Sequence, residues 1–126
     1  MSVFYKIDKE RRLVMSTGSG AFTLVDALAH QQRLANDPDF DPSFSQLVDL
    51  THVTSVDVTA SDIRKLAQAN LFSRGSRRAI LATSDVAFGL ARMFEALRES
   101  AGEDGIQVFR DLNEALDWLF ARGANA

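Results

Sequence analysis

The chain has 126 residues, a formal net charge of −3 and a composition of 46% hydrophobic and 25% charged residues. This length fits one domain in which roughly two-thirds of the unfolded surface becomes buried. The composition is typical of a globular protein, and the small negative charge argues against nucleic acid as a partner, because phosphate binding requires clustered basic residues. We expect a single domain over residues 1–126.

The sequence also argues against several kinds of site. The chain has no cysteine, so it has neither a disulfide nor a thiol nucleophile, and His30 and His52 alone are too few for a typical zinc site. We expect no metal and no cofactor. No apolar run approaches the roughly 20 residues of a membrane-spanning helix, and the opening MSVFYKID lacks the order of a signal peptide. The expected location is the cytoplasm, without a membrane span.

The first third of the chain predicts a hairpin followed by a helix. β-prone runs at 3–7 and 12–17 flank a polar turn, which is the spacing of two antiparallel strands. Thr23 is a natural N-cap for a helix that ends before NDPDFDPSF, with Asp26 at its third position. The residues that follow the helical period, and so mark the expected inner face, are Leu24, Val25, Leu28, Gln32 and Ala35.

The rest of the chain alternates between strands and helices. Strands are predicted at 45–50, 77–83 and 106–109, and the final helix at 111–122 opens with Asp111 and Glu114 in capping-box spacing. Two helices lie between these strands. The apolar residues of the first are Ile63, Leu66, Ala67 and Leu71, and those of the second are Val86, Leu90, Met93 and Leu97. The charged residues of the second, expected in solvent, are Arg92, Glu95, Arg98 and Glu99.

This order of elements predicts an α/β fold: a single open, mixed, mostly parallel five-stranded sheet with four helices and right-handed crossovers. In such sheets ligands bind at the carboxyl ends of the strands. The polar residues expected at that edge are Ser16, Thr17, Asp49, Thr51, Thr83, Ser84, Asp85 and Asp111. Helix caps occupy the same edge, so each hydroxyl or carboxylate has a structural alternative to ligand binding.

The stretch DLTHVTSVDVTASDI, residues 49–63, is rich in hydroxyls and carboxylates. Thr59 and Asp62 form a variant of the capping box, which explains both residues without any function. The alternative is a surface that binds a partner or ligand, made of Asp49, Thr54, Ser55, Asp57, Thr59 and Asp62. A third interpretation is an enzyme around Asp49, His52 and Asp57, although a hydrogen-bonded turn accounts for these residues without a nucleophile or metal.

The order of elements and the stretch VDLTHVTSVDVTASDI resemble the STAS domains of the SpoIIAA family of anti-anti-sigma factors. In that family an Asp-Ser-Ser-Gly-like motif opens a helix, and one of its serines is phosphorylated. Asp57 and Thr59 fit this motif, whereas Val58 and Ala60 stand where the family has serine and glycine. The resemblance implies a protein partner and makes Thr59 a candidate phosphoacceptor.

A second resemblance covers nearly the whole chain. The stretches ANDPDFDP, LVDLTHVTS, FGLARMFE and VFRDLNEALDWL are similar to those of small bacterial SpoIIAA-like, STAS-related proteins. The likeness of that group to CRAL-TRIO domains implies carriage of a small nonpolar ligand. The residues expected near such an apolar pocket are Phe40, Phe44, Phe88, Met93 and Phe94.

These apolar residues have alternatives. Phe40 and Phe44 lie in a loop, where they tuck beneath that loop, cover a pocket or bury against a second subunit. Phe88, Met93 and Phe94 lie at helical spacing, which is more typical of a core than of a ligand site. Self-association into a homodimer is compatible with each of these alternatives.

Two further patterns carry little weight. Gly18 and Gly20 form a lone G-x-G without the third glycine of a dinucleotide site. The run SRGSRR groups Arg74, Arg77 and Arg78, which we interpret as a solvated loop, with the docking of an anion or an acidic partner as the alternative. The sequence as a whole predicts a domain without catalysis that acts in regulation by binding a protein partner. The alternative is a carrier of a small nonpolar ligand.

Overall fold

The computed structural model describes residues 3–121 and contains, within them, five strands and four helices. The strands are β1 (Val3–Asp8), β2 (Leu13–Thr23), β3 (Ser45–Asp57), β4 (Arg78–Leu81) and β5 (Ile106–Phe109). The helices are α1 (Leu24–Ala35), α2 (Ala60–Leu66), α3 (Asp85–Ser100) and α4 (Leu112–Leu119). The elements alternate after the hairpin, as the sequence predicts.

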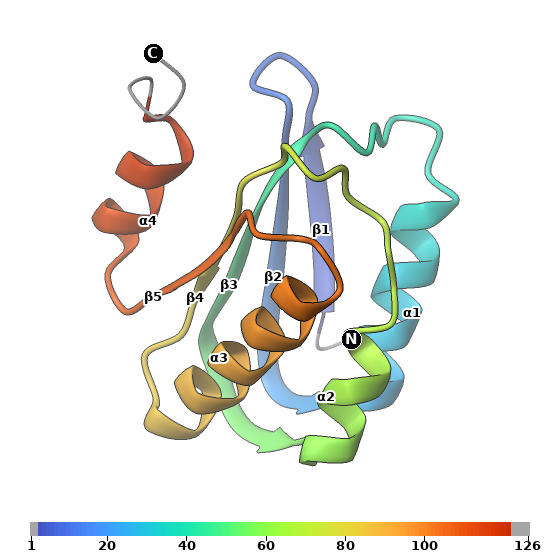
Figure 1. Ribbon diagram of the computed structural model, residues 1–126. Helices are drawn as coiled ribbons and strands as arrows, with labels where there is room; N and C mark the ends of the chain where they lie inside the picture. The colour runs from blue at the N-terminus through green and yellow to red at the C-terminus, as the bar shows by residue number, and fades with distance from the viewer. Residues whose placement is uncertain (1–2, 122–126) are drawn as a thin grey trace.

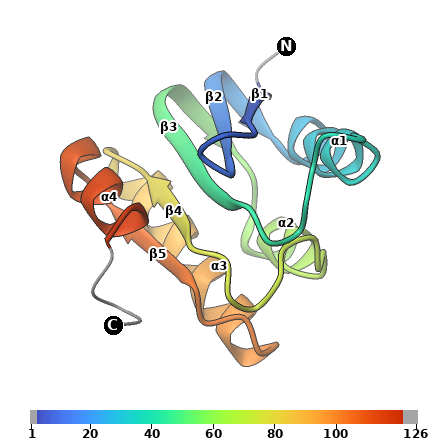
Figure 2. The ribbon, with the colours of Figure 1, turned by 90° about the horizontal axis from the view of Figure 1, so that it is seen from above.

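The five strands form one sheet in the order β1-β2-β3-β4-β5. The β1–β2 pair is antiparallel and the other three pairs are parallel. Because each parallel strand is added on the same side of its predecessor, right-handed crossovers place α1, α2 and α3 on one face of the sheet. Helix α4 follows the last strand and packs on the opposite face, beside β4 and β5 (Figure 1, Figure 2). The predicted α/β fold with a mixed, mostly parallel sheet is confirmed.

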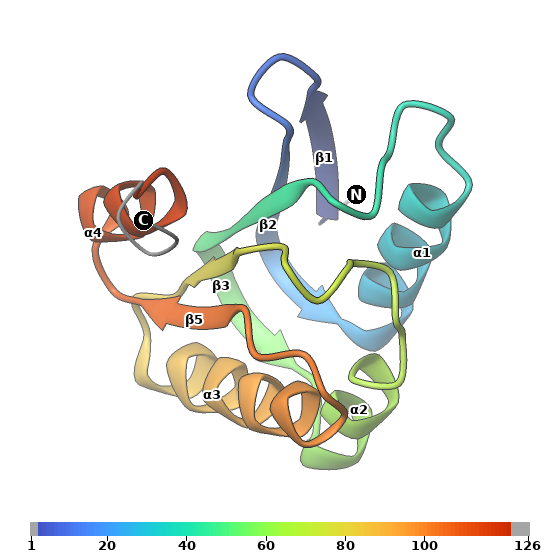
Figure 3. The same cartoon turned by 45° about the horizontal axis from the view of Figure 1, so that its top comes forward.

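Side chains alternate between the two faces with the period of a strand. The face toward α4 carries Leu13, Leu47, Ala79, Leu81 and Phe109, which pack with Ala115 and Leu119. The face toward α1–α3 carries Val14 of β2, Ile80 of β4, and Ile106 and Val108 of β5. The sheet therefore divides the core, with one cluster beside α4 and three clusters on the opposite face. Helices α1, α2 and α3 cover that opposite face (Figure 3).

Strands β2 and β3 are longer than the sequence suggests. We predicted that they end at Thr17 and Leu50, but they continue to Thr23 and Asp57 and pair along that whole length. Backbone hydrogen bonding between two long parallel strands outweighs the weak strand propensity of their polar residues. Four polar residues expected at the carboxyl edge therefore lie within strands instead: Ser16, Thr17, Asp49 and Thr51.

The predicted inner face of α1 is also wrong. Ala27, His30 and Leu34 are buried, whereas Val25 is 75% exposed and Leu28 is 40% exposed. The apolar residues near the start of the helix indicated an apolar face that is displaced by about one residue from the face that is buried. The buried histidine broke the apolar pattern that would have marked the true face.

The loop after α1 is anchored by its two phenylalanines. Phe44 is buried against Val14, Leu34 and Phe72. Phe40 makes an edge-to-face contact with Phe72, with ring centroids 5.1 Å apart. Both phenylalanines thus pack beneath their own loop, the first of the three alternatives considered for them.

All four helices within residues 3–121 begin at an N-cap whose side chain accepts a backbone hydrogen bond: Thr23, Thr59, Ser84 and Asp111. Thr59 and Asp62 make both bonds of a capping box. The interpretation of Thr59 and Asp62 as a helix cap is confirmed. It does not explain the other polar residues between 49 and 63.

Candidate functional site

The end of β3 separates an apolar inner side from a polar outer side by means of two bulges. Along β2, the partners of Thr17, Ser19, Gly20 and Ala21 are Asp49, His52, Val53 and Ser55. At two points β3 therefore advances by one residue more than β2, and each extra residue shifts the alternation of side chains. As a result, the β3 side chains that line the interior here are Leu50, Val53 and Val56, followed by Val58.

The outer side carries most of the predicted partner-binding residues. Thr54, Ser55 and Asp57 are exposed on β3, and Thr59 is exposed at the start of α2. We call these four residues the outer strip. Asp62, half-buried, accepts a hydrogen bond from the Thr59 backbone N–H at 3.0 Å. Five of the six predicted residues thus lie together, where β3 leads into α2.

Asp49 lies apart from the outer strip. Its Oδ1 accepts hydrogen bonds from the Thr51 backbone N–H at 2.9 Å and from Thr51 Oγ1 at 2.6 Å. A strand rises about 3.3 Å per residue, so Asp49 and Asp57 are separated by roughly 25 Å. His52 is exposed between them. The three side chains do not converge on one point, and the catalytic arrangement that an enzyme at these residues requires is not formed.

Within residues 3–121 there is no group of three or more histidine and carboxylate side chains placed to hold a metal ion. In the same part of the chain, no helix is both long and apolar enough to cross a membrane.

An apolar cavity of about 140 Å³ lies between the sheet and helices α1–α3. Its apolar walls come from β2, β3, β4 and the three helices, and include Phe22, Leu50, Val53, Val56, Val58, Ile63, Leu66, Ile80, Leu90 and Phe94. Of the five residues predicted near an apolar pocket, Phe94 lines it. Phe40 and Phe44 pack beneath their loop, while Phe88 and Met93 pack in core clusters beside it. The valines at 53, 56 and 58 are the wall residues that sequence reasoning missed, because they were assigned to a polar turn.

One part of the cavity wall is polar. Its hydrogen-bonding residues are Ser16, His30, Gln46 and Arg78, all of which line the cavity. Ser16 Oγ lies 2.8 Å from His30 Nε2 and accepts a hydrogen bond from Gln46 Nε2 at 3.0 Å. Gln46 Oε1 in turn accepts from Arg78 Nε at 3.1 Å. The Arg78 bond fixes which way the Gln46 amide points, and so fixes Gln46 as the donor to Ser16.

Burial lowers the pKa of His30 to about 4, and the positive charges of Arg33 and Arg78 act in the same direction. The ring is therefore neutral at pH 7 and adds no charge to the interior. A neutral imidazole has one donor and one acceptor nitrogen, so His30 can either donate to Ser16 or accept from it.

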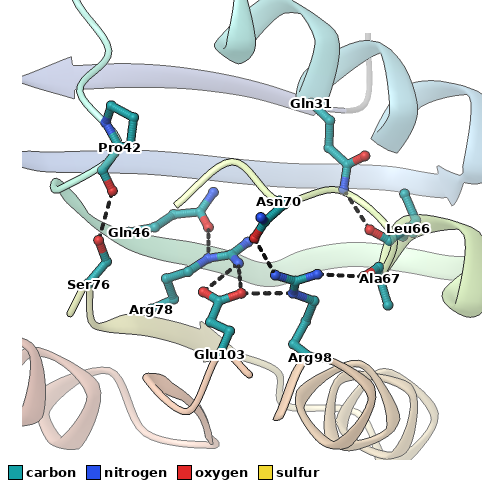
Figure 4. Close-up of polar contacts among 10 residues, drawn as sticks. All are labelled: Gln31, Pro42, Gln46, Leu66, Ala67, Asn70, Ser76, Arg78, Arg98 and Glu103. Atoms are coloured by element: carbon teal, nitrogen blue, oxygen red, sulfur yellow. Dashed lines mark hydrogen bonds and ion pairs between the residues drawn. The ribbon is translucent and has the colours of Figure 1, made fainter. Parts of the chain in front are cut away.

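Arg78 shares one carboxylate with a second buried arginine, Arg98. Arg78 Nη1 lies 3.0 Å from both oxygens of Glu103, and Arg98 Nε lies 2.8 Å from Glu103 Oε1 (Figure 4). The exposed fractions of the side chains are 11% for Arg78, 5% for Arg98 and 3% for Glu103. We call Arg78 and Arg98 the buried arginine pair, and Glu103 is the carboxylate that they share.

This arrangement corrects two predictions. Arg98 was expected on the solvated face of α3, but it is buried, with Nη1 donating to the Ala67 carbonyl and Nη2 to Asn70 Oδ1 (Figure 4). Arg78 was expected in a solvated loop, but its side chain is only 11% exposed and pairs with Glu103. Arg77 is also held, since its Nη1 donates to the carbonyls of Trp118 and Ala121. A helix can place an arginine at the same spacing for a surface pair or for an interior network, so the spacing did not distinguish them.

Comparisons with known proteins identify the fold. No protein-family model matches the chain, and no curated protein matches it. Among solved structures, it is similar to an uncharacterized protein of the DUF3478 family with a SpoIIAA-like fold from Shewanella loihica PV-4, with a TM-score of 0.60 and 21% identity over 94% of each chain. It is also similar to an anti-sigma factor antagonist from Mycobacterium paratuberculosis, with a TM-score of 0.56 and 15% identity over 94% of each chain. The chain therefore has the SpoIIAA-like fold of STAS domains.

Proposed function

We propose that the protein is a regulatory binding domain without catalysis, and that it recognises a protein partner through the outer strip. The observation that carries this proposal is the pair of bulges in β3, which turns Thr54, Ser55 and Asp57 outward on a strand whose valines are fixed inside. Hydrogen-bonding groups held on a rigid element lose little conformational freedom when a partner binds. The similarity in fold to an anti-sigma factor antagonist supports a protein partner.

Thr59 has a double role in this proposal. Its Oγ1 accepts the hydrogen bond from the Asp62 backbone N–H at 3.1 Å, which caps α2, and the residue is exposed to a partner. A phosphate on Thr59 would be stabilised by the helix N-terminus and opposed by the Asp62 carboxylate. Recognition of the unmodified strip is therefore the core of the proposal, and phosphorylation of Thr59 remains a prediction from the family resemblance.

The test uses a partner co-purified with the tagged chain from its source cells and then isolated for binding measurements. We expect Ser55→Arg to weaken binding about tenfold or more, because a long charged side chain at the centre of an interface removes contacts and costs desolvation. Thr59→Glu should also weaken binding. The matched control is Ser100→Arg, the same substitution at an exposed residue at the end of α3, which should bind as the unaltered protein does.

If the partner binds the unaltered protein, Ser55→Arg, Thr59→Ala and Thr59→Glu with equal affinity, the outer strip is not part of the interface. Thr59→Ala is included because loss of the cap costs about 1 kcal/mol of stability. Circular dichroism of each variant separates that effect from a loss of contact.

The apolar cavity favours a second candidate function, the carriage of a small nonpolar ligand. An apolar cavity of about 150 Å³ in another protein accepts benzene, so a volume of about 140 Å³ admits a molecule of that size. The two functions use opposite sides of the same segment of β3, so one does not exclude the other. Native mass spectrometry of gently purified protein would show a bound ligand as an added mass.

A further inference from the structure

The buried arginine pair is not balanced in charge. Arginine stays protonated in proteins, and Glu103 is the one carboxylate within residues 3–121 that pairs with Arg78 or Arg98. The remaining partners are Gln46, Asn70 and the Ala67 carbonyl, which are neutral. One net positive charge therefore stays inside the protein, where an uncompensated charge is costly.

The two arginines differ in how fully their donors are used. In Arg98, Nε, Nη1 and Nη2 each donate a hydrogen bond. In Arg78, Nε and Nη1 donate, while Nη2 donates to no residue in the described part of the chain. The guanidinium of Arg78 lies over the rings of Phe72 at 4.3 Å and Phe94 at 5.7 Å, which stabilises the cation without neutralising it. The unused donor thus belongs to the arginine that lines the cavity.

The cavity sets limits on the anion that would balance this charge. Most of its walls are apolar, so a free inorganic anion there would lose its hydration without gaining enough hydrogen bonds in return. A molecule with an apolar body and one anionic end satisfies both parts of the wall. A carboxylate can accept a charge-assisted hydrogen bond from the unused Nη2 of Arg78, which is stronger than a bond to a neutral acceptor. Ser16 and His30 lie on the same polar part of the wall.

We infer that the cavity binds a small apolar carboxylic acid, with its ring or short chain against Val48, Ile80 and Phe94 and its carboxylate at Arg78. This inference rests on the second candidate function, the carriage of a small ligand, and specifies the chemical class of that ligand. The acid completes the charge balance of the buried arginine pair and occupies the apolar volume above it.

The experiment is isothermal titration calorimetry of the whole chain at pH 7 with benzoate and with benzyl alcohol, which share a ring and differ in charge. We expect benzoate to bind about tenfold or more tightly than benzyl alcohol, because a charge-assisted hydrogen bond is stronger than a neutral one. Arg78→Met should remove that advantage, so that benzoate binds no more tightly than benzyl alcohol. The variant keeps the ion pair between Arg98 and Glu103, so its interior carries no net charge from this group.

A second variant tests the location. Val48 lines the cavity two residues from Gln46, the β3 partner of Arg78, and is half-buried, so Val48→Phe should fill part of the volume beside Arg78 and weaken both probes. In the unaltered protein, amide chemical shifts of β3 and β4 should move with benzoate, a measurement that needs no variant to fold.

The outcomes separate the inference from the function on which it rests. Equal or tighter binding of benzyl alcohol would overturn the carboxylic acid and leave a neutral nonpolar ligand for the cavity. Binding of neither probe would overturn both. Equal competition by inorganic phosphate would show a site for any anion and would overturn the apolar acid.

Discussion

Replacing Glu103 with glutamine is expected to lower the free energy of unfolding by about 3–5 kcal/mol. The substitution keeps the size of the side chain but removes the one negative charge that Arg78 and Arg98 share. Two guanidinium groups then face each other in the interior with neutral partners alone. Urea denaturation followed by circular dichroism gives the change in free energy.

The control for this prediction is an exposed ion pair. Lys9 and Asp39 lie 3.3 Å apart, with 67% and 58% of their side chains exposed. Asp39→Asn should change stability by no more than about 1 kcal/mol, since water screens such pairs. If Glu103→Gln lowered the free energy of unfolding no more than the control does, the two arginines would not depend on this carboxylate. The argument that one positive charge is left unbalanced beside the cavity would then lose its basis.

Leu34→Ala is expected to cost about 2–5 kcal/mol, because it leaves a cavity where a fully buried side chain packs against Val14, Phe44 and Phe72. Leu28→Ala is the matched control, with the same change in the same helix at a side chain that is 40% exposed. Its cost should be below about 1 kcal/mol. Thermal and urea unfolding of the two variants measure the difference.

This pair of variants tests the orientation of α1. The sequence favours a face that contains Leu28, and the structure places Leu34 and His30 inside. A larger loss of stability for Leu28→Ala than for Leu34→Ala would contradict the structure and restore the face expected from the sequence.

The order of elements could be predicted because it depends on local signals. The hairpin turn, the caps at Thr23, Thr59 and Asp111, and the compact apolar strands are each recognised within a few residues. Alternation of strands and helices then leaves few topologies to choose from. The α/β class follows from these signals alone.

The inner side of the site could not be predicted, because it depends on contacts between distant residues. The bulges in β3 arise from its pairing with β2, and they replace the regular period of two by valines at 53, 56 and 58. That irregular spacing resembles a loop when read along the chain. A signal was present all the same, since the polar residues of this stretch are interrupted by valine at every second or third position.

The buried arginine pair shows the same limit in another form. Arg98 is spaced along α3 like a surface residue, and its carboxylate partner lies in the loop after the helix. Arg78 lies on β4, far from Glu103 in the sequence, and the two residues meet only because the chain folds. Helical spacing identifies charges that can pair within one helix, but not charges that pair across the core.

The final third of β3 links the two proposed binding sites. Its exposed residues Thr54, Ser55 and Asp57 belong to the outer strip, and its inward residues Val53 and Val56 belong to the cavity wall.

The most direct test is the reactivity of single cysteines along this segment, which the absence of native cysteine allows. Cysteines that replace Thr54, Ser55 and Asp57 should react with a thiol reagent roughly fivefold or more faster than those that replace Val53, Val56 and Val58. A regular strand would instead group residue 55 with residue 53, and residue 54 with residue 56. That pattern would contradict the bulges and, with them, the outer strip and the valine part of the cavity wall.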